Sequence, residues 1–310
     1  MNNNKKKMLG LVLMMGVVTV AQAEVLVILP ESGPMARAAS SIQQGFLHVY
    51  QTSKQKTPVR FVDNHQFSIA SIFQTEVNEQ TELVVGPLSR QQLEELIALQ
   101  PKVKTLALNH IDQQHPNVTQ FSLAKHEDAR ALMQVIQKDG IQELLTVRKV
   151  GTEKEYELFL SALLDLLNIR HEVVDQIPPS LDAQQGILLL GDAAWLAGLG
   201  QLPHAQIYAT ANAIEDVINI PSGLKFCDTA AQYKHEWRSI QQVAAGQAMP
   251  FQRLIAFGGD TAQLAQFYLN APKTEKYQFE GRTGKISVHG NQIQRLPVCF
   301  HYDNATLKTL

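Results

Sequence analysis

The feature that most restricts the fold is an alternation, along most of the chain, of short apolar runs with stretches of helical period. The runs, such as VLVILP, ELVVGP and GILLLGD, are rich in β-branched or leucine side chains. Residues 89–99, 126–138 and 153–167 lie between such runs and place apolar side chains at helical spacing. Strand, helix and strand in this order form crossover units, and a strand that is apolar throughout is covered on both faces. The alternation therefore predicts an α/β fold with parallel sheets, and 310 residues favour two lobes over a single core.

The first 23 residues have the three-part layout of a secretory signal peptide. Residues 5–7 are lysines, residues 8–20 form an apolar segment too short to span a membrane comfortably, and Ala21-Gln22-Ala23 forms a cleavage site. The alternative, a buried N-terminal helix, would have to turn three adjacent lysines to solvent. A lipoprotein signal requires a cysteine at the cleavage point, where this chain has Glu24. We expect cleavage after Ala23 and a soluble periplasmic protein without a lipid anchor.

The charge balance excludes one class of partner. The chain has 27 Lys and Arg against 29 Asp and Glu, and loss of the three lysines with the signal peptide leaves 24 against 29, a net charge of −5. A mildly acidic chain without a basic block is not typical of a nucleic-acid-binding protein. No later segment is apolar over the length that a membrane span requires.

Cys227 and Cys299 are the only two cysteines in the sequence. In an oxidising compartment two distant cysteines can form a disulfide, and the alternative is a pair of small buried thiols. The sequence leaves both open, because it does not show whether the two Cα atoms come within about 7 Å.

Several segments resemble a known family. The opening VLVILPESGPMARAASSIQQGF is similar to the start of type I periplasmic binding proteins. LVVGPLSRQQLEELIAL followed by KVKTLALNH resembles a narrower group, the penicillin-binding-protein activators or LppC-type lipoproteins. Five further segments resemble the same group, and they come in the family's order as far as about Pro297. They are FSLAKHEDAR, QIYATANAI, GLKFCDTA, RLIAFGGDTAQLA and FEGRTGKISVHGNQIQRLP.

The resemblance implies two Rossmann-like lobes joined by three crossings, with a cleft between the lobes. We expect lobe 1 at residues 24–121 and 252–284, and lobe 2 at residues 122–251 and 285–310. The resemblance also implies a non-catalytic role in stimulating a class A penicillin-binding protein, or contact with another cell-envelope protein. Typical members carry a lipid-anchoring cysteine and a helical-repeat domain before this region, and this sequence shows neither.

Two competing chemistries are disfavoured. Ser122 and Lys125 form a Ser-x-x-Lys, and Arg282-Thr283-Gly284 is similar to the Lys-Thr-Gly of penicillin-recognising enzymes, but no Ser-Asp-Asn accompanies them. Ser122 is better explained as the N-cap of a helix whose first turn is acidic. His110, Asp112 and His115 could hold a metal, but histidines on a surface loop are more often solvated. We therefore predict no enzyme activity, no cofactor and no metal.

The turns that follow the apolar runs are the predicted site, because open α/β sheets bind ligands at the carboxyl ends of their strands. The residues expected there are Ser32, Gly33, Pro34, Gly86, Pro87, Ser89, Asn109, His110, Asn212 and Asp260. Asp260, expected at a helix start, would hold an amine, and Ser32 and Ser89 a carboxylate. The glycines and prolines are equally explained as turn residues. Long side chains after Ser89 could fill the cleft instead.

Two functions stay open at this point. One is the protein-binding role that the resemblance implies. The other is a soluble solute-binding protein that delivers a small amino-acid-like ligand to a transporter.

Overall fold

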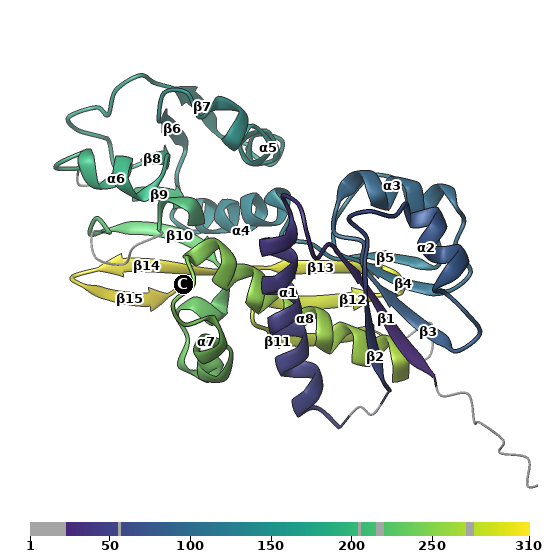
Figure 1. Cartoon of the computed structure of the whole chain (residues 1–310). Helices are drawn as coiled ribbons and strands as arrows, with labels where there is room; N and C mark the ends of the chain where they lie inside the picture. The colour runs from purple at the N-terminus through teal and green to yellow at the C-terminus, as the bar shows by residue number, and fades with distance from the viewer. Residues whose placement is uncertain (1–22, 55–56, 204–205, 215–219, 271–275) are drawn as a thin grey trace, which may run out of the picture.

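The computed structural model describes residues 23–54, 57–203, 206–214, 220–270 and 276–310. Nearly all of the predicted signal peptide, residues 1–22, lies outside the described residues. The described chain forms two lobes, each built on one twisted sheet flanked by helices (Figure 1). The predicted fold class, two Rossmann-like lobes of type I periplasmic-binding-protein kind, is confirmed.

The sheet of the first lobe contains eight strands in the order β2-β1-β3-β4-β5-β13-β12-β11. Neighbours from β2 to β13 pair in parallel, whereas β13, β12 and β11 pair antiparallel. The strands are β1 (Glu24–Leu29), β2 (Val59–Asp63), β3 (Thr81–Val85), β4 (Lys104–Ala107), β5 (Val118–Gln120), β11 (Lys276–Gly281), β12 (Gly284–His289) and β13 (Gln292–Leu296).

The sheet of the second lobe contains seven strands in the order β7-β6-β8-β9-β10-β14-β15. The five strands from β7 to β10 pair in parallel, and β14 and β15 add an antiparallel edge. The strands are β6 (Glu143–Arg148), β7 (Arg170–Val173), β8 (Gln185–Leu190), β9 (Gln206–Thr210), β10 (Leu224–Asp228), β14 (Val298–Asp303) and β15 (Thr306–Thr309).

Helices cover both faces of the first sheet. One face packs against α1 and α8, and the other against α2 and α3. In the second lobe α4 and α5 cover one face, and α6 covers part of the other. The helices are α1 (Ala36–Thr52), α2 (Ile69–Thr75), α3 (Arg90–Ala98), α4 (Lys125–Lys138), α5 (Glu153–Leu164), α6 (Ala193–Gly198), α7 (Arg238–Ala244) and α8 (Met249–Asn270).

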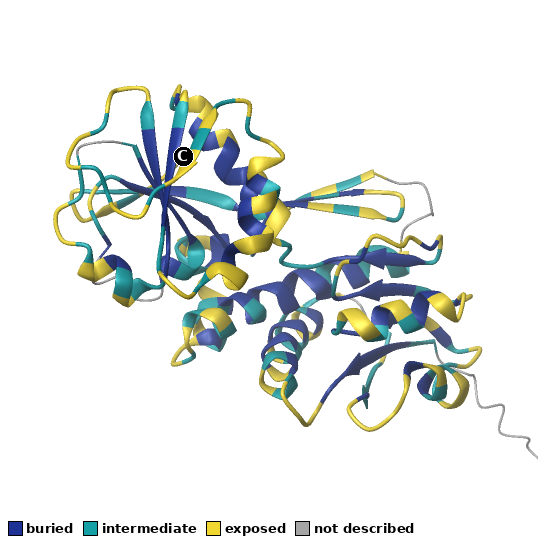
Figure 2. Cartoon of the chain, turned by 90° about the horizontal axis from the view of Figure 1, so that it is seen from above, coloured by how far each residue is buried: buried dark blue, intermediate teal, exposed yellow. Residues whose placement is uncertain are grey.

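The burial pattern explains why the sequence reads as uninterrupted apolar runs. In β1 every residue after Glu24 is buried, because helices lie above and below that strand. Figure 2 shows central strands of both lobes in dark blue between helices whose outer faces are yellow.

The chain passes between the lobes three times, as the family resemblance implies. It leaves the first lobe after Phe121, returns between β10 and α8, and crosses again at Pro297 between β13 and β14. The predicted boundary after residue 284 is therefore wrong. Gly284 lies at a hairpin turn inside the first sheet, where β11 and β12 pair, so residues 285–296 belong to lobe 1 and not to lobe 2.

Helix α8 also corrects an expectation about Asp260. We expected a helix start after Gly258-Gly259, but α8 continues through both glycines. The reason is close packing against α1, since a Cβ on Gly258 would lie 2.0 Å from the carbonyl oxygen of Ile42. On the α1 side, a Cβ on Gly45 would lie 1.8 Å from the carbonyl oxygen of Ile255. The glycines thus let two backbones meet and do not end the helix.

The two cysteines are directly opposite each other on the antiparallel pair β10 and β14. Their Cα atoms lie 3.9 Å apart and their sulfurs are bonded, so the disulfide alternative is confirmed and the pair of free thiols is wrong. Among the described helices, none has the length and apolar character needed to cross a membrane.

Candidate functional site

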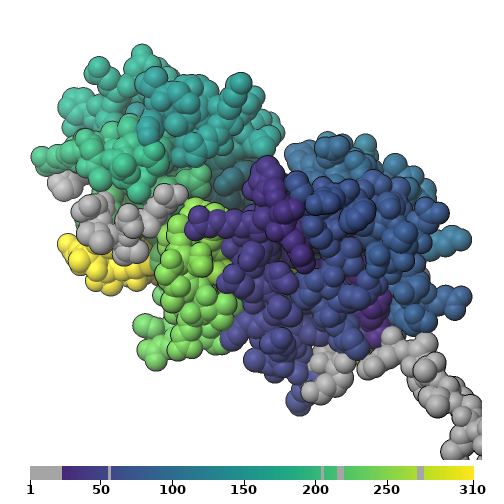
Figure 3. Space-filling view, viewed as in Figure 1, coloured from purple at the N-terminus to yellow at the C-terminus, as the bar shows by residue number. Residues whose placement is uncertain are grey.

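The candidate site is a cavity of about 440 Å³ between the lobes. Its walls come from the starts of α3 and α4, the loop after β4, the first half of α8 and, from the second lobe, α5. The space-filling view shows the blue first lobe and the teal second lobe meeting along a recess at this edge (Figure 3).

The floor of the cavity is apolar. Leu88, Leu108 and Phe257 are buried, and Leu123 and Leu254 are partly buried beside them. Phe257 is held in place by Phe121, whose ring lies 4.8 Å from it in a stacked arrangement. Because these side chains belong to the core of the first lobe, the floor is a rigid surface.

The rim of the cavity carries mostly basic groups: Arg90, His110, Lys125 and His126 line it, against one acid, Asp112. Arg90 forms no ion pair with any described residue, and Lys125 reaches Asp128 only at 3.9 Å. The rings of His110 and His126 lie 5.5 Å apart. Both rings reach solvent, but partial burial lowers the pKa of each, so both are neutral at pH 7.

The N-terminus of α4 opens onto the same cavity. The helix begins at Lys125 with Ala124 as its N-cap, and no side chain accepts a hydrogen bond from its first turn. The predicted N-cap role of Ser122 is therefore wrong, because the helix starts two residues later than that role requires. Ser122 instead lies among the lining residues of the cavity.

The first predicted turn, Ser32-Gly33-Pro34, does not line this cavity. Gly33 has a φ of +77°, and a Cβ there would lie 2.2 Å from the ring of His65, so this position requires glycine. The backbone N–H of Glu31 and that of His65 both donate to Asp63 at 2.9 Å. An incoming carboxylate would thus meet a negative charge, which argues against the anion-binding role expected for Ser32.

At the second predicted turn, Gly86 and Pro87 are buried and joined by a cis peptide. The hydroxyl of Ser89 accepts the N–H of Gln92 at 3.2 Å and donates to that side chain at 3.1 Å. The amide of Gln92 also bonds Asn64. The side chain of Gln92 therefore fills the space beside Ser89, as the long residues of this segment had suggested.

Asn109 and His110 are the two predicted residues that do line the cavity. Asn109 fixes its loop by donating to the carbonyl oxygen of Leu88 at 2.8 Å and accepting the N–H of His110 at 2.8 Å. Asn212 instead lines a separate pocket of about 20 Å³ beside Tyr156 and donates to Glu155 at 3.1 Å.

Asp260 is fully buried and cannot bind a ligand amine, which corrects the role expected for it. One carboxylate oxygen accepts the backbone N–H of Arg282 at 2.8 Å and its guanidinium at 3.1 Å. The other oxygen accepts the backbone N–H and the hydroxyl of Thr283, both at 2.7 Å. Asp260 therefore anchors the β11–β12 turn to α8.

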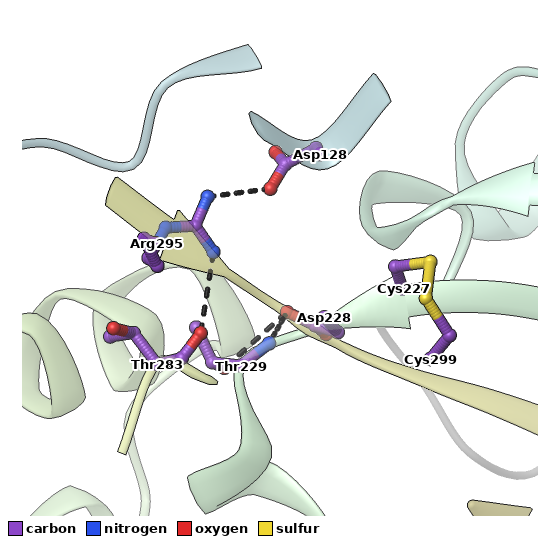
Figure 4. Close-up of a disulfide and its surroundings, with 7 residues drawn as sticks. All are labelled: Asp128, Cys227, Asp228, Thr229, Thr283, Arg295 and Cys299. Atoms are coloured by element: carbon purple, nitrogen blue, oxygen red, sulfur yellow. Dashed lines mark hydrogen bonds and ion pairs between the residues drawn. A yellow bond between two sulfur atoms is a disulfide. The ribbon is translucent and has the colours of Figure 1, made fainter. Parts of the chain in front are cut away.

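Sequence reasoning missed two buried arginines, Arg295 and Arg253, whose ion pairs join the lobes. Arg295 on β13 pairs with Glu127 on α4 at 3.1 Å. Arg295 also pairs with Asp128 on α4 at 2.7 Å and donates to the carbonyl oxygen of Thr283 (Figure 4). Arg253 on α8 makes two 2.8 Å bonds to Asp228 at the end of β10. In the sequence these residues appear as charged side chains within apolar helical or strand patterns. That pattern indicates a buried ion pair only when the residue of opposite charge is also known.

The described residues do not form the metal cluster that was considered for His110, Asp112 and His115. Among the residues that the structure describes, no three His, Cys, Asp or Glu side chains gather as a metal site would require. His115 is buried, and its Nδ1 accepts the N–H of Asn117 at 3.2 Å.

Comparison with known families gives a match to LppC putative lipoprotein over residues 7–149, slightly less than half of the chain. A curated relative, penicillin-binding protein activator LpoA of Haemophilus ducreyi, is 24% identical over 92% of this chain and 54% of its own length. The chain is similar to the LppC-type activators. The resemblance inferred from sequence is thereby confirmed, and the chain spans about half the length of that activator.

Solved structures agree with this relation at the level of the fold. The C-domain of LpoA from Haemophilus influenzae, described as a regulator of PBP1A, superposes with a TM-score of 0.74 at 18% identity. The match covers 93% of this chain and 100% of that domain. A putative branched-chain amino acid transporter protein from Chromobacterium violaceum superposes with a TM-score of 0.73 at 22% identity, over 90% of this chain and 99% of its own. A regulator domain and a transporter protein thus share this fold, so the fold alone does not identify the function.

Proposed function

We propose that this protein is a non-catalytic regulator of a class A penicillin-binding protein and acts in the periplasm by binding its partner directly. The main support for the proposal is the extent of the structural match, because 93% of this chain superposes on the whole C-domain of LpoA. The chain also matches the LppC family model over residues 7–149. Relatives of this chain are named activators, which supports a role by contact and not by catalysis.

The turns of the cleft also favour this role over delivery of an amino acid to a transporter. The turn at Ser32 faces Asp63, the hydroxyl of Ser89 is engaged by Gln92, and Asp260 is buried in an ion pair. None of the three is free to hold the carboxylate or the amine of an amino acid. A solute-binding protein for such ligands needs those groups available.

The second lobe offers an apolar surface for a partner. Among the described residues, eight large apolar side chains are exposed, and five of them lie between residues 150 and 173: Val150, Leu158, Leu164, Leu166 and Val173. Val150 is 92% exposed and Val173 is 51% exposed. They follow or end the neighbouring parallel strands β6 and β7, so both lie at the same edge of the sheet. Exposed apolar side chains that gather on one surface mark interaction sites.

The test uses purified class A penicillin-binding protein and its lipid-linked substrate. We expect the chain to bind the synthase in a pull-down and to raise its rate of glycan polymerisation or cross-linking. The double variant Val150→Ser with Val173→Ser should bind more weakly, whereas Phe67→Ser, which changes a 58% exposed apolar residue on the first lobe, should not. Absence of binding and of any rate change with the wild-type chain would refute the proposed role.

A further inference from the structure

The interlobe cavity combines two features that a protein–protein role does not use: a rigid apolar floor and a rim with unpaired positive charge. Its volume of about 440 Å³ lies within the range of small-molecule sites. From these features we propose that the cavity binds a carboxylate ligand with an apolar body and no amino group. This inference goes beyond the regulatory role and does not depend on it.

Recognition of the carboxylate follows from the charges. Arg90 has a fixed fork of N–H donors suited to a carboxylate and has no ion-pair partner among the described residues. Lys125, at the start of α4, also lines the cavity and pairs with Asp128 only at 3.9 Å. The first turn of α4 adds backbone N–H groups that no side chain caps, and the positive end of its dipole favours an anion. The two acids of that turn, Glu127 and Asp128, are paired with Arg295.

Recognition of the apolar body follows from the floor and the opposite wall. Leu108 and Phe257 offer a buried apolar surface, and Leu158 of α5 projects toward it from the second lobe while 65% exposed. A ligand seated between them would remove apolar surface on both sides from water. Burial of apolar surface contributes roughly 25 cal/mol per Å².

Amino acids are disfavoured as ligands because the described lining of the cavity offers little negative charge to pair with their ammonium group. Of the described residues that line the cavity, Asp112 alone is acidic, and it lies exposed on the loop after β4. Glu155 lines the smaller pocket and accepts a hydrogen bond from Asn212. An ammonium group next to Arg90 and Lys125 would therefore be repelled by two cations, with Asp112 as the one acidic side chain of the described lining to offset them.

The experiment compares matched probes by calorimetry with the purified full chain. We expect 3-phenylpropanoate to bind. Its amide, which lacks the charge, and phenylalanine, which adds an ammonium group, should each bind at least tenfold more weakly, about 1.4 kcal/mol. Propanoate, which lacks the ring, should also bind more weakly.

Variants then assign the binding to this cavity. Arg90→Gln should weaken 3-phenylpropanoate by about tenfold, and Leu158→Ser should weaken it while leaving propanoate unchanged. Lys138→Gln is the control, since it removes one charge from the exposed far end of α4. Equal binding of the amide, tighter binding of phenylalanine, or no binding of any carboxylate at millimolar concentration would overturn the proposal. Activation of the synthase is measured separately, so its failure is a distinct result.

The two histidines supply an independent readout. Because the pKa of His110 and of His126 is lowered, both rings are neutral at pH 8, and a carboxylate beside them should favour their protonation. Affinity for 3-phenylpropanoate should therefore rise as the pH falls from 8 to 6, and His110→Gln with His126→Gln should flatten that rise. The charged groups near the two rings are Arg90 from α3, Asp112 from the loop after β4, Lys125, Asp128 and Arg130 from α4, and Arg295 from β13. A pH-independent affinity in the wild type would count against carboxylate binding at this rim.

Discussion

Replacing Asp260 by alanine tests whether this carboxylate holds the fold together or serves a ligand. The change removes the acceptor of four hydrogen bonds, from the backbone N–H and guanidinium of Arg282 and from the backbone N–H and hydroxyl of Thr283. It also leaves Arg282, whose side chain is 14% exposed, without its ion pair. Removing one partner of a buried pair costs about 3–5 kcal/mol. We therefore expect the free energy of unfolding to fall by that amount. The corresponding decrease in Tm is on the order of 10 °C.

The assay is chemical and thermal denaturation followed by circular dichroism and by tryptophan fluorescence. Trp237 is a local probe, because the guanidinium of Arg282 lies 4.9 Å from its ring centroid. Asp165→Ala is the matched control: this aspartate is exposed at the end of α5, and its loss should change stability by no more than about 0.5 kcal/mol. A loss below about 1 kcal/mol for Asp260→Ala, together with weaker ligand binding, would refute the anchoring role.

Three further outcomes are expected. The double variant Cys227→Ser with Cys299→Ser removes a disulfide that closes a loop of 72 residues, and loop entropy predicts that the free energy of unfolding falls by about 4 kcal/mol. Denaturation with and without reductant measures this loss. An unchanged midpoint would contradict it. A fluorescent penicillin should not label the chain covalently, because Ser122 lies on a loop among cavity residues and is not followed by a matched Ser-Asp-Asn element; labelling that Ser122→Ala abolishes would reveal an acylated serine. N-terminal sequencing of periplasmic protein should show cleavage after Ala23, and a chain that retains residue 1 would disprove processing.

Much of the fold could be predicted because local patterns carry it. The run from Val25 to Leu29 reads as a doubly covered strand and is one, and the helical stretch at 126–138 forms α4 with a start only one residue earlier. The boundary between the lobes was misplaced at residue 284 because a glycine turn looks the same in a hairpin as at a crossing. Pairing partners decide that question, and they lie far apart in the sequence.

The candidate site was predicted less well, for a related reason. Turn residues identify where strands end, so Asn109 and His110 were found. Whether a turn is available depends on side chains from other elements: Asp63 and His65 close the first turn, and Gln92 with Asn64 closes the second. No local pattern contains that information.

The sequence by itself determined the α/β class, the order of strands and helices and the family resemblance, because each depends on periodicity or on neighbouring residues. Only the tertiary structure decided that Asp260 is an anchor and that Cys227 and Cys299 meet. It also brought Arg90 and Lys125 to the rim of one apolar cavity. Hydrogen-bond partners, burial and charge are properties of surfaces that folding brings together, and the residues in each of these sets are separated by tens of positions along the chain.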